Sequence, residues 1–405
     1  MRETLLERSA QGERLLDASA ARRIIAALLA IEFVDELVSG LLGAAWPSIR
    51  AELGLSYAQI GILLSAPGLI GTALELPLGI LSDQRRRLTI ILAGGLAFTA
   101  SVALVATAGS YGWLLAALCL FSPASGAFVS LSQAALMDTD PERHERLMVW
   151  WTVSGGIAVV LGPAALAASW SLGWGWRAPL LAMGALSLAL TLAVALLEPP
   201  QRVVTRSSGP SLLKGLGEAA RLMLEARVLR WLVLLALADL VLELLVDLLA
   251  LYMVDIVHLS QSGAASAVML WRGAGLAGEV VLVWLLTRIE GVRVVRATAA
   301  IAAVLIPCML VFEAAPAKLV IVGLLGFVSA GWYSVAMARL YTELPGRSGA
   351  ALTICAIFGV ADGLVPAAFG WLAQRAGLEI ALGLVALAPV GILILLRRPG
   401  PEPEG

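Results

Sequence analysis

Twelve stretches of about 20 mostly apolar residues constrain the fold of this chain more than any other feature. A helix of about 20 residues crosses the hydrocarbon core of a bilayer. The composition agrees, since 60% of the 405 residues are hydrophobic and 14% are charged, whereas soluble domains average about 45–50% and about 25%. The expected spans are 24–46, 58–81, 88–108, 111–136, 149–169, 177–197, 230–254, 264–286, 294–313, 318–338, 350–373 and 378–396.

The basic residues predict how these spans are oriented. If residue 1 lies in the cytoplasm, 23 of the 28 lysines and arginines fall in cytoplasmic segments, four in outer loops and one inside a span. Cytoplasmic loops carry such an excess, so we expect both termini in the cytoplasm. The predicted organisation is a cytoplasmic N-terminal segment (1–23), a six-helix bundle (24–197), a cytoplasmic central loop (198–229), a second six-helix bundle (230–396) and a cytoplasmic tail (397–405).

The two halves also resemble each other in sequence. A shift of 204 positions places Asp35 on Asp239 and Glu75 on Glu279, so that acids inside expected spans coincide. This offset predicts a duplicated unit, as in transporters whose site lies between two repeats. The expected fold is therefore an all-α membrane protein with twelve transmembrane helices in two pseudo-symmetric six-helix bundles. The segment 1–23 fits either an amphipathic helix on the membrane surface or a frayed polar tail.

Acids inside the expected spans are the main indication of function. An acid at the centre of a membrane helix costs about 2.5–3.5 kcal/mol, so we expect these side chains to line a wet central cavity. Three of these acids share one face of the first expected span, and three others lie four residues apart in the seventh expected span. Burial and crowding favour the protonated carboxyl, so some should exchange protons near neutral pH. The candidate substrate- and proton-coupling acids are Glu32, Asp35, Glu36, Asp239, Glu243, Asp247 and Asp362.

Arg272 is the one basic residue well inside an expected span. It needs an acidic partner, and the candidates are Glu279 or an acid of the seventh span. The pair is either a fixed internal ion pair or a counter-charge that competes with proton or substrate. Glu75 and Glu279 precede the cytoplasmic ends of their spans, where they either pin the helix ends or take part in transport. An acidic cavity favours cationic or neutral substrates, with a metal cation on oxygen ligands as an alternative.

The segment LPLGILSDQRRRLTII (76–91) resembles the signature loop of the major facilitator superfamily. The matching positions are Gly79, Asp83, Arg86 and Arg87, whereas Gln84 stands where the family has a basic residue. The resemblance implies a loop that helps to hold the cytoplasmic side closed, in which Asp83 pairs with an arginine or a helix N-terminus. The alternative is that the arginines only anchor the loop in the cytoplasm.

The segment SGGIAVVLGPAALAA (154–168) is similar to the antiporter motif of drug exporters in the same superfamily. Gly162 and Pro163 occupy the matching positions. Small residues permit close helix crossing, and Pro163 should bend the helix; ordinary small-residue packing is the alternative. The segment WPSIRAELGLSYAQIGIL (46–63) is similar to the connection between the first two helices in fosmidomycin-resistance-type efflux members.

This resemblance implies a secondary active transporter that works by alternating access, and we favour proton-coupled efflux of a small amphiphilic or cationic organic molecule. The alternatives are a proton-coupled nutrient importer, a lysolipid or lipid flippase, and a non-transporting receptor. The sequence has no Walker-type loop, nucleophile–base motif or zinc-ligand pattern, so we expect no enzyme activity, no cofactor and no resident metal. The expected partners are a small-molecule substrate, protons and the lipid of a bacterial inner membrane, without nucleic acid, and the resemblance implies a monomer.

Overall fold

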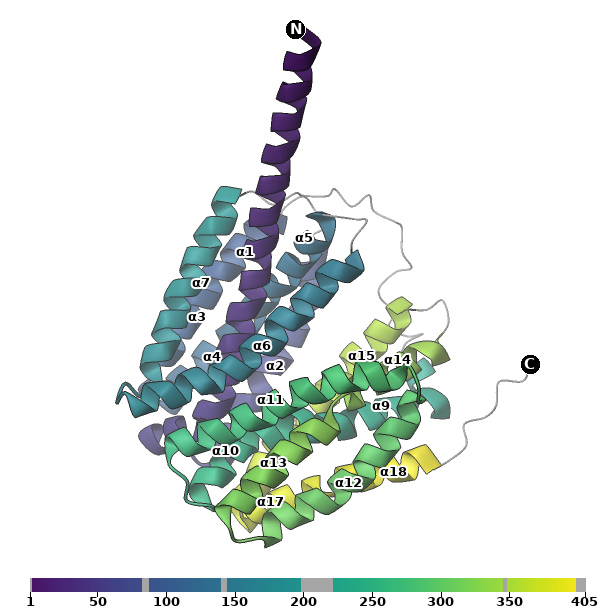
Figure 1. Ribbon diagram of the computed structural model, residues 1–405. Helices are drawn as coiled ribbons and strands as arrows, with labels where there is room; N and C mark the ends of the chain where they lie inside the picture. The colour runs from purple at the N-terminus through teal and green to yellow at the C-terminus, as the bar shows by residue number, and fades with distance from the viewer. Residues whose placement is uncertain (1, 82–86, 140–143, 198–220, 345–347, 398–405) are drawn as a thin grey trace, which may run out of the picture. The chain divides into compact units, whose positions relative to one another are not determined.

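The structure, a computed structural model, consists of helices, turns and connecting segments in the residues that it describes (Figure 1). These residues are 2–81, 87–139, 144–197, 221–344 and 348–397, and side chains are described for 22–74, 87–139, 146–197, 221–344, 354, 355 and 357–397. Each of the twelve expected spans corresponds to one helix or to a run of helices joined end to end. The predicted all-α membrane fold is therefore confirmed.

The first half of the chain contains six helical segments, one for each expected span. They are α1 (Arg2–Leu53), α2 (Tyr57–Leu81), α3 (Arg87–Ala106), the run α4 (Tyr111–Ser125), η2 (Gly126–Ser130) and α5 (Leu131–Thr139), α6 (His144–Ser171) and α7 (Arg177–Leu197).

The second half repeats this arrangement with more interruptions. Its segments are the run α9 (Ala226–Asp239), η3 (Leu240–Leu244) and α10 (Leu245–Asp255), then α11 (Gln261–Leu286), α12 (Gly291–Val311), the pair α13 (Ala315–Ser329) and α14 (Trp332–Glu343), the pair α15 (Ser348–Asp362) and α16 (Val365–Ala376), and the pair α17 (Leu378–Val385) and α18 (Leu387–Arg397).

Ten of the helical segments in the described residues are long and apolar enough to cross a membrane. The two remaining expected spans, 24–46 in α1 and 230–254 in α9–η3–α10, are also helical, and each carries three acids. The two spans outside these ten are therefore the ones that carry the acidic stripes. Their helical structure fits the membrane because a helix satisfies its own backbone hydrogen bonds.

Several spans are interrupted where the sequence predicts continuous helices. Two contain π-helical turns, η2 and η3. The tenth span breaks at Gly331, whose φ of 78° is a left-handed conformation that glycine adopts without strain. The eleventh breaks just before Pro366, which has no N–H to continue the hydrogen-bond ladder. Interruptions of this kind, π-turns above all, are frequent at functional sites.

A cation closes the end of the third helix of each half. In the first half, the Arg177 guanidinium donates to the carbonyl oxygens of Ala106 and Ala108 at the end of α3, at 2.5 and 2.7 Å. In the second half, the buried Lys318 ammonium donates to the Met309 carbonyl oxygen near the end of α12, at 2.9 Å, and also to the Tyr252 hydroxyl. Cations at helix C-termini satisfy orphan carbonyls.

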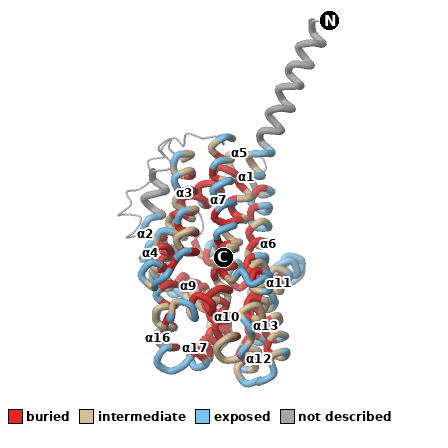
Figure 2. Tube along the Cα trace, turned by 90° about the vertical axis from the view of Figure 1, so that its left-hand side faces the viewer, coloured by how far each residue is buried: buried red, intermediate tan, exposed pale blue. Residues whose placement is uncertain are grey.

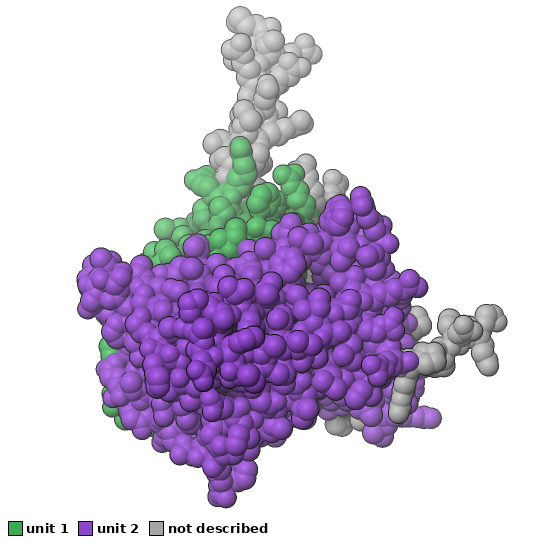
Figure 3. Space-filling view, turned by 60° about the horizontal axis from the view of Figure 1, so that its bottom comes forward, with its two compact units in different colours: residues 1–39, 73–159, 177–206 green, residues 40–72, 160–176, 207–405 purple. Residues whose placement is uncertain are grey.

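The chain divides into two compact units whose segments alternate along the sequence (Figure 3). The first unit contains 1–39, 73–159 and 177–206, and the second contains 40–72, 160–176 and 207–405. The helices α1, α2 and α6 contribute residues to both units. In the second unit, α10 is buried along most of its length (Figure 2), so it lies inside the packing of that unit.

Candidate functional site

The acids of α1 lie in the first unit and face two other helices of that unit. Glu32 is buried, and Asp35 and Glu36 are half-buried. The Ser125 hydroxyl donates a hydrogen bond to Oδ1 of Asp35 at 2.8 Å. Ser125 is the last residue of α4 and directly precedes the π-turn η2. The Asp35 carboxylate is therefore held where the fourth span departs from α-helical geometry.

A glycine of α6 covers the same acidic face. A Cβ atom placed on Gly155 would lie 2.7 Å from Oε1 of Glu32 and 3.2 Å from Cγ of Glu36. The neighbouring Ser154 hydroxyl donates to the Leu29 carbonyl oxygen at 3.0 Å, which fixes α6 against α1. Small residues allow two helices to approach closely, so the backbone of α6 lies directly against Glu32 and Glu36.

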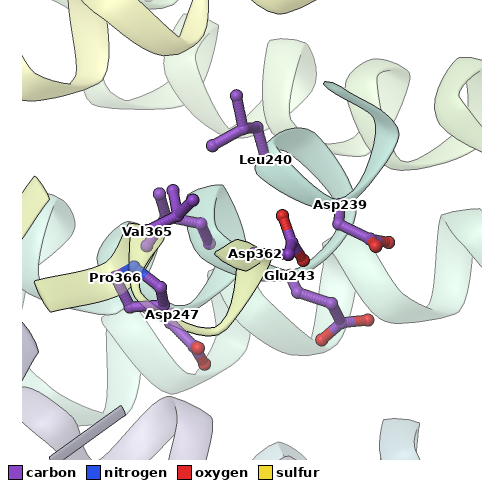
Figure 4. Close-up of a pocket in the computed structure, with 8 residues that line it drawn as sticks. Asp239, Leu240, Glu243, Asp247, Asp362, Val365 and Pro366 are labelled. Carbon is purple, nitrogen blue, oxygen red and sulfur yellow. The ribbon is translucent and has the colours of Figure 1, made fainter. Parts of the chain in front are cut away.

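The acids of the seventh span line a cavity in the second unit (Figure 4). This cavity has a volume of about 230 Å³. Four of its lining residues are acids, three from α9–η3–α10 and one from the end of α15. The lining residues are Asp239, Leu240, Glu243, Leu244, Asp247, Asp362, Val365 and Pro366. The structure thus brings together four of the seven candidate acids.

The π-turn η3 explains why three acids spaced four apart can share this cavity. In a regular α-helix of 3.6 residues per turn, residues eight apart differ by about 80° around the axis. A π-turn accommodates one additional residue, which reduces that difference to about 20°. The turn η3 lies between Asp239 and Asp247 and includes Glu243. It therefore keeps the acidic stripe on one face of the span.

Arg272 of α11 pairs with Glu243. Its two terminal nitrogens lie 3.3 and 3.0 Å from the two carboxylate oxygens, which is a bidentate geometry. The Arg272 side chain is 22% exposed and that of Glu243 is 62% exposed. Of the two partners that the sequence suggests for Arg272, the acid of the seventh span therefore makes the ion pair. Glu279, seven residues further along α11, is exposed.

The remaining predicted residues lie away from the acids or outside the described side chains. Gly162 and Pro163 are buried within α6, which continues through the proline. Arg87 forms an ion pair with Asp138 at the end of α5, at 2.5 Å. The residues whose side chains lie outside the described part of the chain are Glu75, Gly79, Asp83 and Arg86.

Three site residues, Ser125, Gly155 and Pro366, were not indicated by their sequence pattern. Gly43 was, because it lies seven residues after Glu36 and continues the acidic face of the first span. A Cβ atom on Gly43 would lie 3.5 Å from Oδ1 of Asp247, so α1 also approaches the cavity acids. Gly155 belongs to the antiporter-like segment, which is the only sequence signal that could have identified it, and it lies against Glu32, four spans earlier in the chain. Ser125 and Pro366 follow from tertiary contacts alone.

The sequence matches a known protein family over most of its length. A family model described as Major Facilitator Superfamily matches residues 28–361. The fosmidomycin resistance protein of Escherichia coli strain K12 is 27% identical over 141 residues, which cover 35% of this chain and 34% of that protein. The match therefore spans about a third of the length of this relative.

Two solved structures share the fold. A bacterial homologue of the human lysosomal transporter Spinster superimposes with a TM-score of 0.73 at 15% identity, covering 93% of this chain and 97% of that one. The nucleoside transporter NupG gives a TM-score of 0.71 at 14% identity, covering 93% and 100%. At these identities the likeness concerns the fold alone.

Proposed function

Because this chain belongs to the Major Facilitator Superfamily, we propose that it exports a small amphiphilic or cationic organic molecule in exchange for protons. The chain is a multi-pass integral membrane protein and a transporter, and it is not an enzyme. The direction of transport, the coupling ion and the substrate class are the proposal.

The observation that carries the proposal is the cavity walled by four carboxyl groups in the second unit. One of the four, Glu243, is paired with Arg272, which leaves an excess of acids over bases around the cavity. Such a surface attracts cations and disfavours anions. Acids inside the membrane are costly, so their presence indicates a function. Carboxyl groups can exchange protons and bind cations, and these are the functions that we assign to them.

In this proposal Asp35 and Asp239 exchange protons and help to hold substrate, and Glu36 and Glu243 assist them. Asp247 and Asp362 add to the negative field of the cavity. Protonation of a carboxyl removes the charge that attracts a cation, so a proton that binds on one side of the membrane helps to release substrate there. Glu32 is enclosed beside Asp35 and shares its proton chemistry.

Export is favoured over import by two features. The segment around Gly162 and Pro163 is similar to the antiporter motif, and the relative matched over a third of its length is named for resistance to fosmidomycin. We further propose that residues 24–197 and 230–396 are the two bundles that move relative to one another. The loop around Gly79, Asp83, Arg86 and Arg87 then helps to close the cytoplasmic side. Glu75 and Glu279 stabilise nearby helix ends. Both termini then lie in the cytoplasm of a bacterium, and the protein acts as a monomer.

The test is transport by the purified protein in proteoliposomes with an imposed pH gradient. Organic cations are screened first by their effect on thermal unfolding at two pH values. Flux of the best ligand is then compared between the parent and the double variant Asp35→Asn/Asp239→Asn. The matched control is Glu379→Gln, because Glu379 is an exposed acid at the start of α17.

We expect the parent and Glu379→Gln to drive substrate against the proton flow, and the double variant to remain folded but inactive. Normal gradient-driven flux in the double variant would contradict the assignment of the acids. Flux of substrate and protons in the same direction would identify an importer. Movement of a lipid headgroup would identify a flippase, and binding without any flux would identify a receptor.

A further inference from the structure

The parts of α1, α2 and α6 that belong to the second unit contact helices of the second half along three interfaces. The first joins α1 to α10, the second joins α2 to α16, and the third joins α6 to α11. In the third, the Ser262 hydroxyl donates to the Ala167 carbonyl oxygen at 3.3 Å, and a Cβ atom on Gly273 would lie 3.6 Å from Val160. All these residues lie in the second unit.

The α1–α10 interface extends from the cavity to the ends of both helices. It begins where Gly43 lies against Asp247, and it ends where Arg50 pairs with Asp255 at 2.8 Å. The two contacts are seven residues apart on α1 and eight apart on α10, or about 10–12 Å along each helix. Most residues of the two helices between these contacts are buried, among them Trp46, Ile49, Leu248 and Leu251. Both helices are thus packed along the length between the cavity and this end.

The α2–α16 interface is built on glycine. A Cβ atom on Gly61 would lie 2.5 Å from the Pro366 carbonyl oxygen, and one on Gly370 would lie 2.8 Å from Cα of Gly61. The Ser65 hydroxyl accepts a hydrogen bond from the Ala367 N–H at 2.9 Å. Because the close atoms belong to backbone, the two helices approach each other more closely here than any side chain would allow.

One polar cluster connects these two interfaces at the end of the helices, where α1 is joined to α2. Oδ2 of Asp255 accepts hydrogen bonds from Arg50 at 2.8 Å and from the Tyr57 hydroxyl at 2.6 Å. The Arg50 guanidinium also lies 4.2 Å from the centroid of the Tyr57 ring. The Tyr57 N–H donates to Gln374 of α16 at 3.0 Å. A single carboxylate therefore ties α1, α2 and α10 together.

We infer that Arg50, Tyr57 and Asp255 form a latch that holds this end of the protein closed over the acidic cavity. The closure rests on the contacts described above, and its part in a transport cycle rests on the proposed function. The distribution of lysine and arginine predicts that this end faces the outside of the cell.

The exposure of the latch suits a contact that must open and close. The side chains of Arg50 and Asp255 are 29% and 21% exposed. Separating a fully buried ion pair strongly destabilises the protein, because each buried charge is left unpaired. A fully exposed pair contributes little. The latch lies between these limits, so water can form hydrogen bonds to the separated side chains when the interfaces open.

The latch is tested by the accessibility of the α2–α16 interface, which needs neither substrate nor a proton gradient. The reporter is Ser65→Cys, because Ser65 is 4% exposed and lies in that interface. It is placed in a chain whose native cysteines, Cys119, Cys308 and Cys355, are replaced by alanine. A membrane-impermeant maleimide is added from the side on which Arg50 lies, and the rate of labelling is measured.

We expect slow labelling in the parent and labelling about tenfold faster in Asp255→Asn and in Arg50→Gln, since each breaks a charge-assisted hydrogen bond. Glu379→Gln and Arg375→Gln are the matched controls, because they remove the same charges from exposed positions of the second unit and should leave the rate unchanged. Tyr57→Phe removes one hydroxyl and should give an intermediate rate. Tyr57→Phe also tests the latch if Asp255→Asn or Arg50→Gln fails to fold.

A double-mutant cycle decides whether the residues act together. If they form one latch, Arg50→Gln/Asp255→Asn labels about as fast as either single variant. Effects that multiply, or latch variants that label like their controls, would overturn the inference. Because the assay measures accessibility alone, a negative result is distinct from a failure of gradient-driven flux in the parent, which would refute the proposed function.

Discussion

The acidic regions of the two units occupy matching positions of the repeat but have different surroundings. Asp35 receives a hydrogen bond from Ser125 and lies on a face that Gly155 of α6 covers closely. Asp239, 204 positions later, lines a cavity of about 230 Å³. The position matching Gly155 is Gly359, where a Cβ atom would meet nothing within 4 Å. The second region is therefore open where the first is enclosed.

This difference indicates how the two regions divide the proposed work. A carboxyl held by one hydroxyl donor on a covered face is suited mainly to exchanging a proton, so Asp35 contributes less than Asp239 to holding substrate. A cavity with four acids has room for a cationic group of an organic molecule, and Arg272 at its edge supplies an internal competitor for Glu243. The first two predictions below use the matching position in the other region as their control, and the last two use a control within the same region.

The largest expected effect comes from neutralising the matched acids one at a time. We expect Asp35→Asn to reduce proton-driven flux to the level of empty vesicles while equilibrium binding of substrate persists. We expect Asp239→Asn to weaken binding as well, because Asp239 lines the cavity. Flux is measured with and without a pH gradient, and binding is measured by calorimetry. Loss of binding in Asp35→Asn with retention in Asp239→Asn would reverse the assignment.

The second-largest effect is expected from filling the space beside the α1 acids. In Gly155→Val the added side chain meets Glu32 and Glu36, and overpacking of this kind costs about 1–3 kcal/mol. We expect lower thermal stability and slower transport. The control is Gly359→Val, which should change both by much less because the space around Gly359 is open. Equal effects of the two substitutions would show that the regions do not differ in packing.

A smaller effect comes from removing the donor to Asp35. Ser125→Ala should lower the free energy of unfolding by about 1 kcal/mol, the usual contribution of such a hydrogen bond. Ser130→Ala, at an exposed position of the same π-turn, is the control. Thermal unfolding of the purified protein in detergent measures both. A Ser125→Ala protein as stable as Ser130→Ala would mean that the hydroxyl does not hold the carboxylate.

The smallest effect on stability is expected from the ion pair of the cavity. Arg272→Gln leaves Glu243 with a side chain that is 62% exposed, so water can solvate it and the cost should be about 0.5 kcal/mol or less. Substrate affinity, in contrast, should rise because the internal competitor is gone. Glu243→Gln/Arg272→Gln removes both charges and should abolish that gain. Unchanged affinity in Arg272→Gln would assign the pair a purely structural role.

Much of the fold follows from the sequence, because apolar length and the spacing of acids are local properties. The number of spans depends on apolar length, and the shared face of Glu32, Asp35 and Glu36 depends on helical periodicity. The π-turn η3 and the break at Gly331 could not be predicted in this way, since they depend on which neighbours pack against the helix. The alignment of Asp239 with Asp247 depends on that turn.

The site is less predictable than the fold for the same reason. The sequence indicates that Arg272 needs an acid but offers two, and three-dimensional packing decides in favour of Glu243. Ser125 is one of many serines in apolar helices, and only its distance of 2.8 Å from Asp35 distinguishes it. The Arg50–Asp255 pair joins residues 205 positions apart, and no local pattern connects them.

The hydrogen bond between Ser65 and Ala367 limits what can enter if α2 and α16 separate. Ala367 is the third residue of α16, so its N–H has no partner within its own helix. Separation leaves this donor unsatisfied, and lipid chains offer it no acceptor. A water molecule or a polar group of a passing molecule must therefore accept this hydrogen bond, so lipid chains alone cannot fill the gap between the two helices.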